Sequence, residues 1–164
     1  MLRRTRSNVD PKMAVIQALG ASRQALLRIR AQIKRTKILA HRDEAARAFL
    51  QTLYMVENLL ERVVLRLETM YAAGIVARDS LELPLKIVKW IEENAQGLPP
   101  DIGSIVSIVD EALSVAYAQS SELFSSNILT VQPGSSSAEV ENIIKEAYSV
   151  ASLKLKERGE QEVI

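Results

Sequence analysis

The sequence contains no cysteine, which excludes a disulfide framework and any thiolate metal site. Aromatic residues make up 4% of the chain, and Leu, Ile, Val and Ala supply most of its apolar residues, a composition that suits helix-on-helix packing. No apolar run reaches the ~18 residues of a membrane span, and no signal-peptide segment follows the basic start. These features predict an intracellular, all-α chain, and its 164 residues predict one domain.

Residues that carry catalytic chemistry are also scarce. The single histidine, His41, lies among basic residues and beside Asp43, so we expect it on the surface. No His/Glu spacing matches a metal site, no Gly-rich phosphate loop follows a strand, and the serines cluster away from any base. The sequence therefore predicts a protein that is not an enzyme, with no catalytic residue, no cofactor and no metal.

Charge is unevenly distributed along the chain. Residues 1–42 hold eleven Lys and Arg and one acid, a net charge of +10, whereas residues 43–164 hold ten Lys and Arg and nineteen acids, a net charge of −9. A basic front and an acidic back permit attraction of the front to an anionic partner, or attraction between front and back within or between chains.

A long helix is predicted from Pro11 to about Ala40. Asp10 supplies an N-cap and Pro11 a favourable first helical residue. Apolar and small residues then recur at alternating steps of four and three, which puts them on one stripe of a helix. The stripe is Val15, Leu19, Ser22, Leu26, Ile29, Ile33, Thr36 and Ala40.

A second helix contains Phe49 to Met70 and is expected to end near Gly74. Its charged face is expected to be solvated, and like charges at i,i+4, such as Glu57 with Glu61, do not stabilise it. The apolar stripe must therefore stabilise this helix through a partner. That stripe again follows the four-three spacing and consists of Phe49, Leu53, Val56, Leu60, Val63, Leu67 and Met70.

The two stripes are out of phase by one position across residues 41–44. This segment is either the turn of a helical hairpin or a stutter within one long helix, although no Gly, Pro, Asn or Ser marks a turn. We favour the hairpin, because two long amphipathic helices can bury their stripes against each other.

The rest of the chain divides at Pro and Gly residues. Residues 75–83 are predicted to be a connector, Pro84 to open a short helix whose Trp90 packs in the core, and Leu98 to Asp101 to open a helix that ends near Phe124. Ser137 is expected to cap a final helix, separate from the others, that finishes near Gly159. The predicted segments are a basic arm (1–9), a helical core (10–124), a flexible linker (125–137) and a C-terminal helix and tail (138–164).

Three stretches resemble the ESCRT-III superfamily, and specifically its archaeal cell-division branch, CdvB. Leu60 to Gly74 (LERVVLRLETMYAAG) is similar to the end of that family's second helix, with Arg66 to Thr69 (RLET) the most specific part. Leu98 to Ile102 (LPPDI) resembles the opening of its fourth helix, and Ile143 to Gly159 resembles its detached fifth helix. The matches occur in the family's order and span roughly residues 11–159.

The resemblance implies a long antiparallel hairpin with short helices packed at one end and a linked C-terminal helix. It implies a filament-forming subunit that remodels membranes in archaeal cell division and vesicle budding, peripheral on the inner face of the cell membrane at the division site. The implied partners are the chain itself, sister subunits and an anionic membrane. An AAA ATPase is only indirectly supported, because the proline-rich docking motif is not seen in this sequence.

Three sets of residues are predicted to carry this function. The basic face for membrane or polymer contacts is Arg3, Arg4, Arg6, Arg23, Arg28, Arg30, Lys34, Arg35 and Lys37. The hairpin is held by the stripe from Phe49 to Met70. The C-terminal helix is predicted to dock through Val140, Ile143, Ile144, Ala147, Val150 and Leu155.

Two alternatives stay open. The same basic face could bind nucleic acid, although residues 1–42 contain no aromatic residue for base stacking. The helices could instead form a closed helical oligomer with a purely structural role, in which the basic charge is a solvated face.

Overall fold

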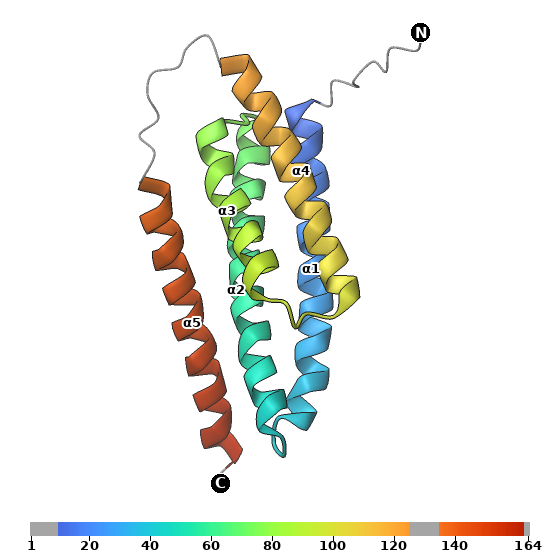
Figure 1. Ribbon diagram of the computed structural model, residues 1–164, viewed down its shortest axis with the longest axis vertical. Helices are drawn as coiled ribbons and strands as arrows, with labels where there is room; N and C mark the ends of the chain where they lie inside the picture. The colour runs from blue at the N-terminus through green and yellow to red at the C-terminus, as the bar shows by residue number, and fades with distance from the viewer. Residues whose placement is uncertain (1–9, 125–134, 163–164) are drawn as a thin grey trace.

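The computed structural model describes residues 10–124 and 135–162, with side chains for 10–120 and 138–157, and within these residues it is all helical (Figure 1). The predicted all-α class is therefore confirmed. The five helices of the described residues are α1 (Pro11–Leu39), α2 (Glu44–Ala73), α3 (Arg78–Asn94), α4 (Pro100–Phe124) and α5 (Ser135–Glu162).

The helices α1 and α2 run antiparallel and pack against each other (Figure 1). The α1 helix begins where the sequence predicts, because the Asp10 carboxylate accepts a 3.0 Å hydrogen bond from the Lys12 N–H and Pro11 is the first helical residue. The α2 helix ends at Gly74, whose φ of 68° lies in the left-handed region that glycine adopts without strain.

A short turn joins the two helices, so the break at residues 41–44 is a turn and not a stutter. The Arg42 N–H donates to the Leu39 carbonyl at 3.2 Å, and the Asp43 carboxylate then accepts from the Ala45 N–H at 3.0 Å. Asp43 thus caps α2 in the way Asp10 caps α1. The turn needs no glycine because no described residue in it has a positive φ.

The two predicted stripes form the interface between α1 and α2. On α1 the residues from Val15 to Thr36 in the stripe are buried, and Ala40 is half-buried. On α2 the stripe is buried from Leu53 to Met70, and Phe49 is half-buried. Each large side chain buried in this way contributes roughly 1.5–3 kcal/mol to folding.

A second face of α1 packs against α4. Ala14, Ala18 and Ala25 are buried and lie on the side of α1 that carries Arg28, which contacts α4. The facing helix also buries small residues, Ala112 and Ala116. Small side chains let the backbones of α1 and α4 approach closely. With α2 on its other side, the first half of α1 is enclosed between two helices.

The α3 helix begins earlier than the sequence predicts. Residues 78–83 were expected in a connector, but they are helical, and Pro84 lies inside α3 rather than at its start. Proline inside a helix removes one backbone hydrogen bond. Burial of Leu81 and Leu83, at 0% and 5% exposure, offsets that loss and holds the extra turns. Trp90 is half-buried against the core, as predicted.

The α4 helix begins at Pro100 and ends at Phe124, as predicted. The α5 helix begins at Ser135, two residues before the expected cap at Ser137, and residues 125–134 of the predicted linker lie outside the described residues. Although α5 was expected to be separate, it packs antiparallel along α2 and also contacts α3.

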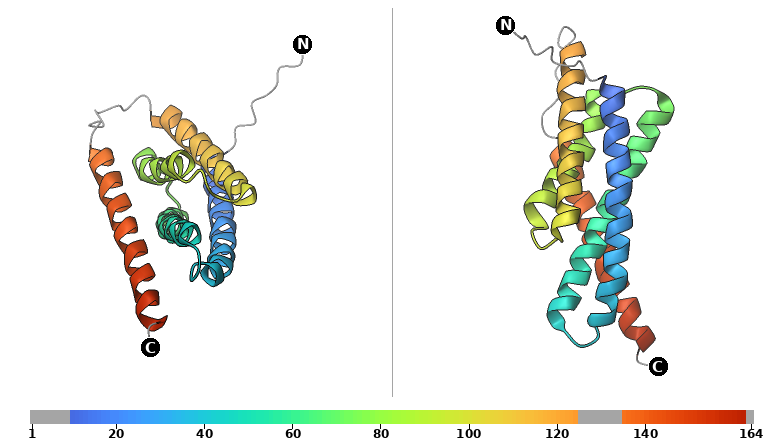
Figure 2. Two further views of the ribbon diagram at one scale, coloured as in Figure 1. Left: turned by 60° about the horizontal axis from the view of Figure 1, so that its bottom comes forward. Right: turned by 90° about the vertical axis from the view of Figure 1, so that its right-hand side faces the viewer.

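The far end of the hairpin projects beyond α3 and α4 (Figure 1, bottom; Figure 2, right). The start of α4 lies level with the middle of α1, where Arg28 contacts Asp101. Beyond that level the hairpin is accompanied only by the end of α5 among the described helices. We call residues 34–47, which contain the turn, the hairpin tip.

Candidate functional site

Metal ligands and membrane-spanning segments are the first features to consider in the described part of the chain. No group of three or more His, Cys, Asp or Glu residues there is placed to hold a metal ion. No helix in the described ranges has the length and apolarity needed to cross a bilayer. Charged surfaces are the candidate sites that stand out on the described residues.

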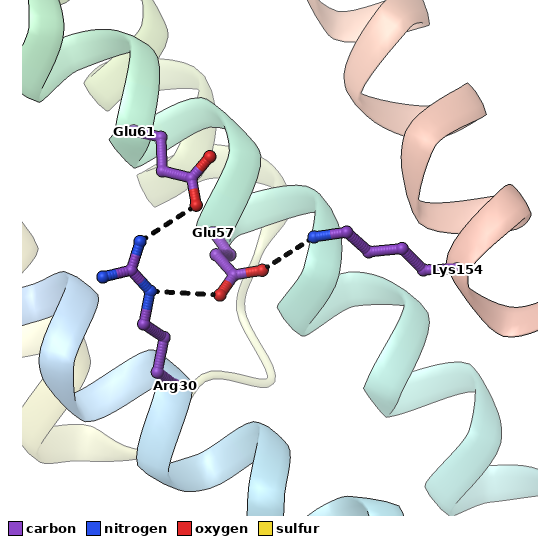
Figure 3. A network of polar contacts seen from close by, with 4 residues as sticks. All are labelled: Arg30, Glu57, Glu61 and Lys154. Atoms are coloured by element: carbon purple, nitrogen blue, oxygen red, sulfur yellow. Dashed lines mark hydrogen bonds and ion pairs between the residues drawn. The ribbon is translucent and has the colours of Figure 1, made fainter. Parts of the chain in front are cut away.

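One carboxylate on α2 connects three helices (Figure 3). Glu57, which is 8% exposed, accepts from Arg30 Nε of α1 at 3.3 Å and from Lys154 Nζ of α5 at 3.1 Å. A second nitrogen of Arg30 donates to Glu61 at 3.0 Å. The guanidinium of Arg30 therefore lies between the two glutamates that the sequence pairs at i,i+4, and it offsets their repulsion.

The charges of this cluster stabilise one another. The hydrogen bond to Glu61, more than any other contact, raises the pKa of Arg30 above its ordinary value, and the charge of Glu57 adds to the effect. Burying a carboxylate is costly unless it is paired, and Glu57 has two cationic partners. The cluster thus holds α1 and α5 on opposite sides of α2.

The opposite edge of α2 is also paired. Arg62 donates to Glu146 at 2.7 Å, and Arg66 donates to Glu139 at 3.3 Å, both on α5. The charged face of α2, which we expected to be solvated, therefore connects it to two helices. A signal was present in the sequence: the acidic pair of α2 complements the basic first helix, and its basic pair complements the acidic start of the last one.

The predicted basic face is divided by the fold. Arg23 pairs with Glu68 of α2 at 2.8 Å, Arg28 with Asp101 of α4 at 2.9 Å, and Arg30 with the cluster just described. The hydrogen bond from Arg28 lowers the pKa of Asp101. Arg3, Arg4 and Arg6 lie outside the described residues.

The remaining cations lie at the hairpin tip. Lys34, Arg35, Arg42 and Arg47 are exposed and form no ion pair with any described side chain; we call these four residues the tip cations. Lys37 instead lies 5.9 Å from the centre of the Tyr54 ring. Ile38 and Leu39, between the tip cations, are 76% and 64% exposed.

An open groove of about 830 Å³ borders the tip between α1, α2 and α5. The ring of Tyr54 lies in it between Lys37 and Lys154, whose Nζ is 5.3 Å from the ring centre. Cations outnumber carboxylates along the groove, which suits it to anionic groups. Its polar and aromatic lining is Arg30, Lys34, Lys37, Tyr54, Glu57, Lys154 and Glu157.

The predicted docking residues of α5 are partly brought together. Val140 and Ala147 are buried, and Ile143, Ile144 and Leu155 pack at the edge of the same core. Val150 is half-buried. Ala151, on the apolar side predicted for this helix, is also fully buried, whereas sequence reasoning missed the hydrogen bond from Gln51 to Ser152 at 3.1 Å.

Comparison with known proteins identifies no related protein. Family models, curated proteins and solved structures were each searched with this chain, and none matched. Function is therefore inferred from the chain's own residues.

Proposed function

We propose that this protein is a non-enzymatic, filament-forming subunit that binds and remodels anionic membranes, similar to the CdvB branch of the ESCRT-III superfamily. Its cellular role in this proposal is membrane constriction in archaeal cell division, with vesicle budding as a related role. The order of the three resembling stretches supports the family, and the long α1–α2 hairpin with a linked α5 is compatible with it.

The observation that carries the proposal is the set of tip cations. They are exposed and lack an ion pair among the described side chains, whereas Arg23, Arg28 and Arg30 are engaged within the molecule. An acidic membrane attracts each nearby cation by about 1 kcal/mol, so four cations contribute on the order of 4 kcal/mol. One subunit would bind weakly and reversibly.

Assembly converts this weak adhesion into strong adhesion. When subunits are joined, each further tip binds at a high effective concentration, and the total affinity rises without any new kind of contact. The acidic residues of positions 43–164 can pair with cations of a neighbouring copy that do not contact the membrane. A filament is thus the form in which this charge distribution is most effective.

Charge reversal at the tip tests the proposal. Lys34→Glu, Arg35→Glu, Arg42→Glu and Arg47→Glu together should abolish sedimentation with phosphatidylserine-containing vesicles at physiological salt. The matched control reverses three exposed lysines elsewhere, Lys12, Lys89 and Lys145, and is compared with the reversal of Lys34, Arg35 and Arg42 alone, so that the net charge changes equally. The control should retain most of the binding, because its charges lie away from the tip.

Two results would contradict the proposal. Equal loss of binding in the two variants would mean that only net charge matters. Binding of duplex DNA by the wild-type chain, in preference to acidic vesicles, would favour the nucleic-acid alternative. Negative-stain images with and without vesicles test assembly: open filaments are expected, and discrete closed particles would favour the closed oligomer.

A further inference from the structure

The hairpin tip combines exposed apolar side chains with cations. Ile38 is 76% exposed, the highest value among the large hydrophobic residues that the structure describes, and Leu39 is 64% exposed. Helical spacing places Ile38 one turn after Lys34, and Leu39 one turn after Arg35. Arg42 follows within the turn itself. Two apolar side chains are thus flanked by cations at one end of the molecule.

Other exposed apolar residues have different surroundings. Leu65, 65% exposed, borders a groove with the Arg23–Glu68 ion pair, so the charges beside it are already neutralised. Ile75, 68% exposed, follows Gly74 near the opposite end of the hairpin. At the start of α1, Met13 and Ile16 also lie beside a cation without a described ion pair, Lys12, but they are less exposed, at 58% and 42%. The tip is distinguished by two adjacent, strongly exposed apolar side chains among four such cations.

We infer that Ile38 and Leu39 are membrane anchors that insert into the interface of an acidic bilayer while the tip cations contact its headgroups. This inference rests on the proposed function and locates the contact on the molecule. An interfacial segment with apolar residues beside Lys and Arg gains both apolar burial and attraction to anionic lipid. The long Lys and Arg side chains can extend to the phosphates while their stems lie along the apolar pair.

The fold also sets the orientation of this contact. The first half of α1 is enclosed by α2 and α4, and its arginines pair with Glu68 and Asp101. The tip, in contrast, projects beyond α3 and α4 (Figure 2, right). The molecule therefore meets the bilayer with the end of its hairpin, and the length of α1 does not lie flat on the surface.

A second copy of the chain is a poorer partner for this patch. A stable protein interface buries about 800 Å² on each partner, far more than two side chains at the apex of a turn can supply. The tip cations would also need carboxylates opposite them. An acidic bilayer provides negative charge and an apolar interior at once.

Paired serine variants test the anchors. Ile38→Ser with Leu39→Ser should lower the partition coefficient onto phosphatidylserine vesicles by at least about tenfold, since two large apolar side chains no longer leave water. The matched control, Leu65→Ser with Ile75→Ser, removes equally exposed apolar side chains and should change it by less than about twofold. Circular dichroism should show the same helix content in both, because none of these side chains is buried.

A tryptophan placed at the tip tests insertion directly. Trp90, the only tryptophan, is replaced by Phe, and Ile38→Trp is introduced in that background. Vesicles with brominated acyl chains should quench this fluorescence and shift it to shorter wavelength. Ile75→Trp in the same background is the control and should remain unquenched.

The outcomes separate the two proposals. Failure of the wild-type chain to bind acidic vesicles would overturn both. Normal binding by the Ile38→Ser, Leu39→Ser variant, with an unquenched tryptophan at position 38, would overturn the anchors and leave the electrostatic function standing. Loss of self-association by this variant without vesicles would identify the patch as a contact between copies and would also overturn the inference.

Discussion

The two halves of α1 follow the same spacing but meet different surroundings. From Pro11 to Arg28 the helix packs between α2 and α4, and alanines let α4 approach closely. From Ile29 to Leu39 one side still packs on α2, while the outward side carries exposed lysine, arginine, isoleucine and leucine. The difference shows that a periodic stripe identifies the side facing one partner and says nothing of the other sides.

The basic residues of α1 differ between the two halves in the same way. In the enclosed half, Arg23 and Arg28 are used within the molecule, each in an exposed ion pair whose contribution to stability is kept small by solvent screening. At the tip, Lys34 and Arg35 have no described ion pair and remain available to an external anion. Charges of one type on one helix therefore meet two different surroundings.

The largest expected effect comes from breaking the core that both halves share. Leu60→Asp with Val63→Asp places two carboxylates at positions that are 0% exposed, without partners, at roughly 4 kcal/mol or more each. The summed cost is comparable to the whole free energy of unfolding of an ordinary domain, so the helical signal in circular dichroism should be lost. Leu65→Asp, at a side chain that is 65% exposed, is the control and should leave the melting curve nearly unchanged.

A smaller effect should be confined to the region near the tip. Glu57→Gln leaves Arg30 and Lys154 without their shared carboxylate and should cost about 1–2 kcal/mol. Hydrogen exchange should become faster in α5 and in the second half of α1, and change little between Pro11 and Arg28. Glu61→Gln is the control: Glu61 pairs only with Arg30 among the described residues, and its side chain is 44% exposed. Unchanged protection of α5 in Glu57→Gln would show that apolar packing alone holds that helix.

The smallest expected effect is a dependence of stability on pH that comes from Glu92 of α3. Burial and a hydrogen bond to Asp110 of α4 raise the pKa of Glu92 from 4.5 to about 7, with nearby Lys89 opposing the shift and Glu93 adding to it. Between these values the folded state holds a proton that the unfolded state has lost, so stability should fall as pH rises from 4.5 to 7 and level off above 7.

Replacing this glutamate should remove that dependence. Because Glu92 is only partly buried and solvent screens its charge, Glu92→Gln should stabilise the protein at pH 8 by about 1 kcal/mol or less. Urea melts at pH 5 and pH 8 measure the change. If wild type and variant lose the same stability between the two pH values, another group is responsible.

The helices themselves could be predicted because their signals are local. Asp10 with Pro11, Gly74, and Pro99 with Pro100 act on the neighbouring backbone, and helix boundaries near them agree with the structure. The start of α3 was missed because Pro84 is such a signal too, yet buried Leu81 and Leu83 outweigh it. The turn at residues 41–44 was ambiguous in the sequence, because it contains no Gly, Pro, Asn or Ser and a stutter in one long helix fits the same change of phase.

The candidate site was predictable only in composition. The sequence contains the cations of the first helix, but it does not show which of them meet a carboxylate, since Glu68, Asp101 and Glu57 are distant along the chain. It does not show that Ile38 and Leu39 remain exposed, because apolar residues at a helix end are equally compatible with burial.

The amino-acid sequence by itself determined the all-helical class, the two stripes and the imbalance of charge, because periodicity and composition act through neighbouring residues. Only the tertiary structure decided which arginines pair within the molecule and which cations remain at the tip. Helix packing brings together residues far apart in the chain, and a charge becomes available to a partner only where that packing leaves it uncovered.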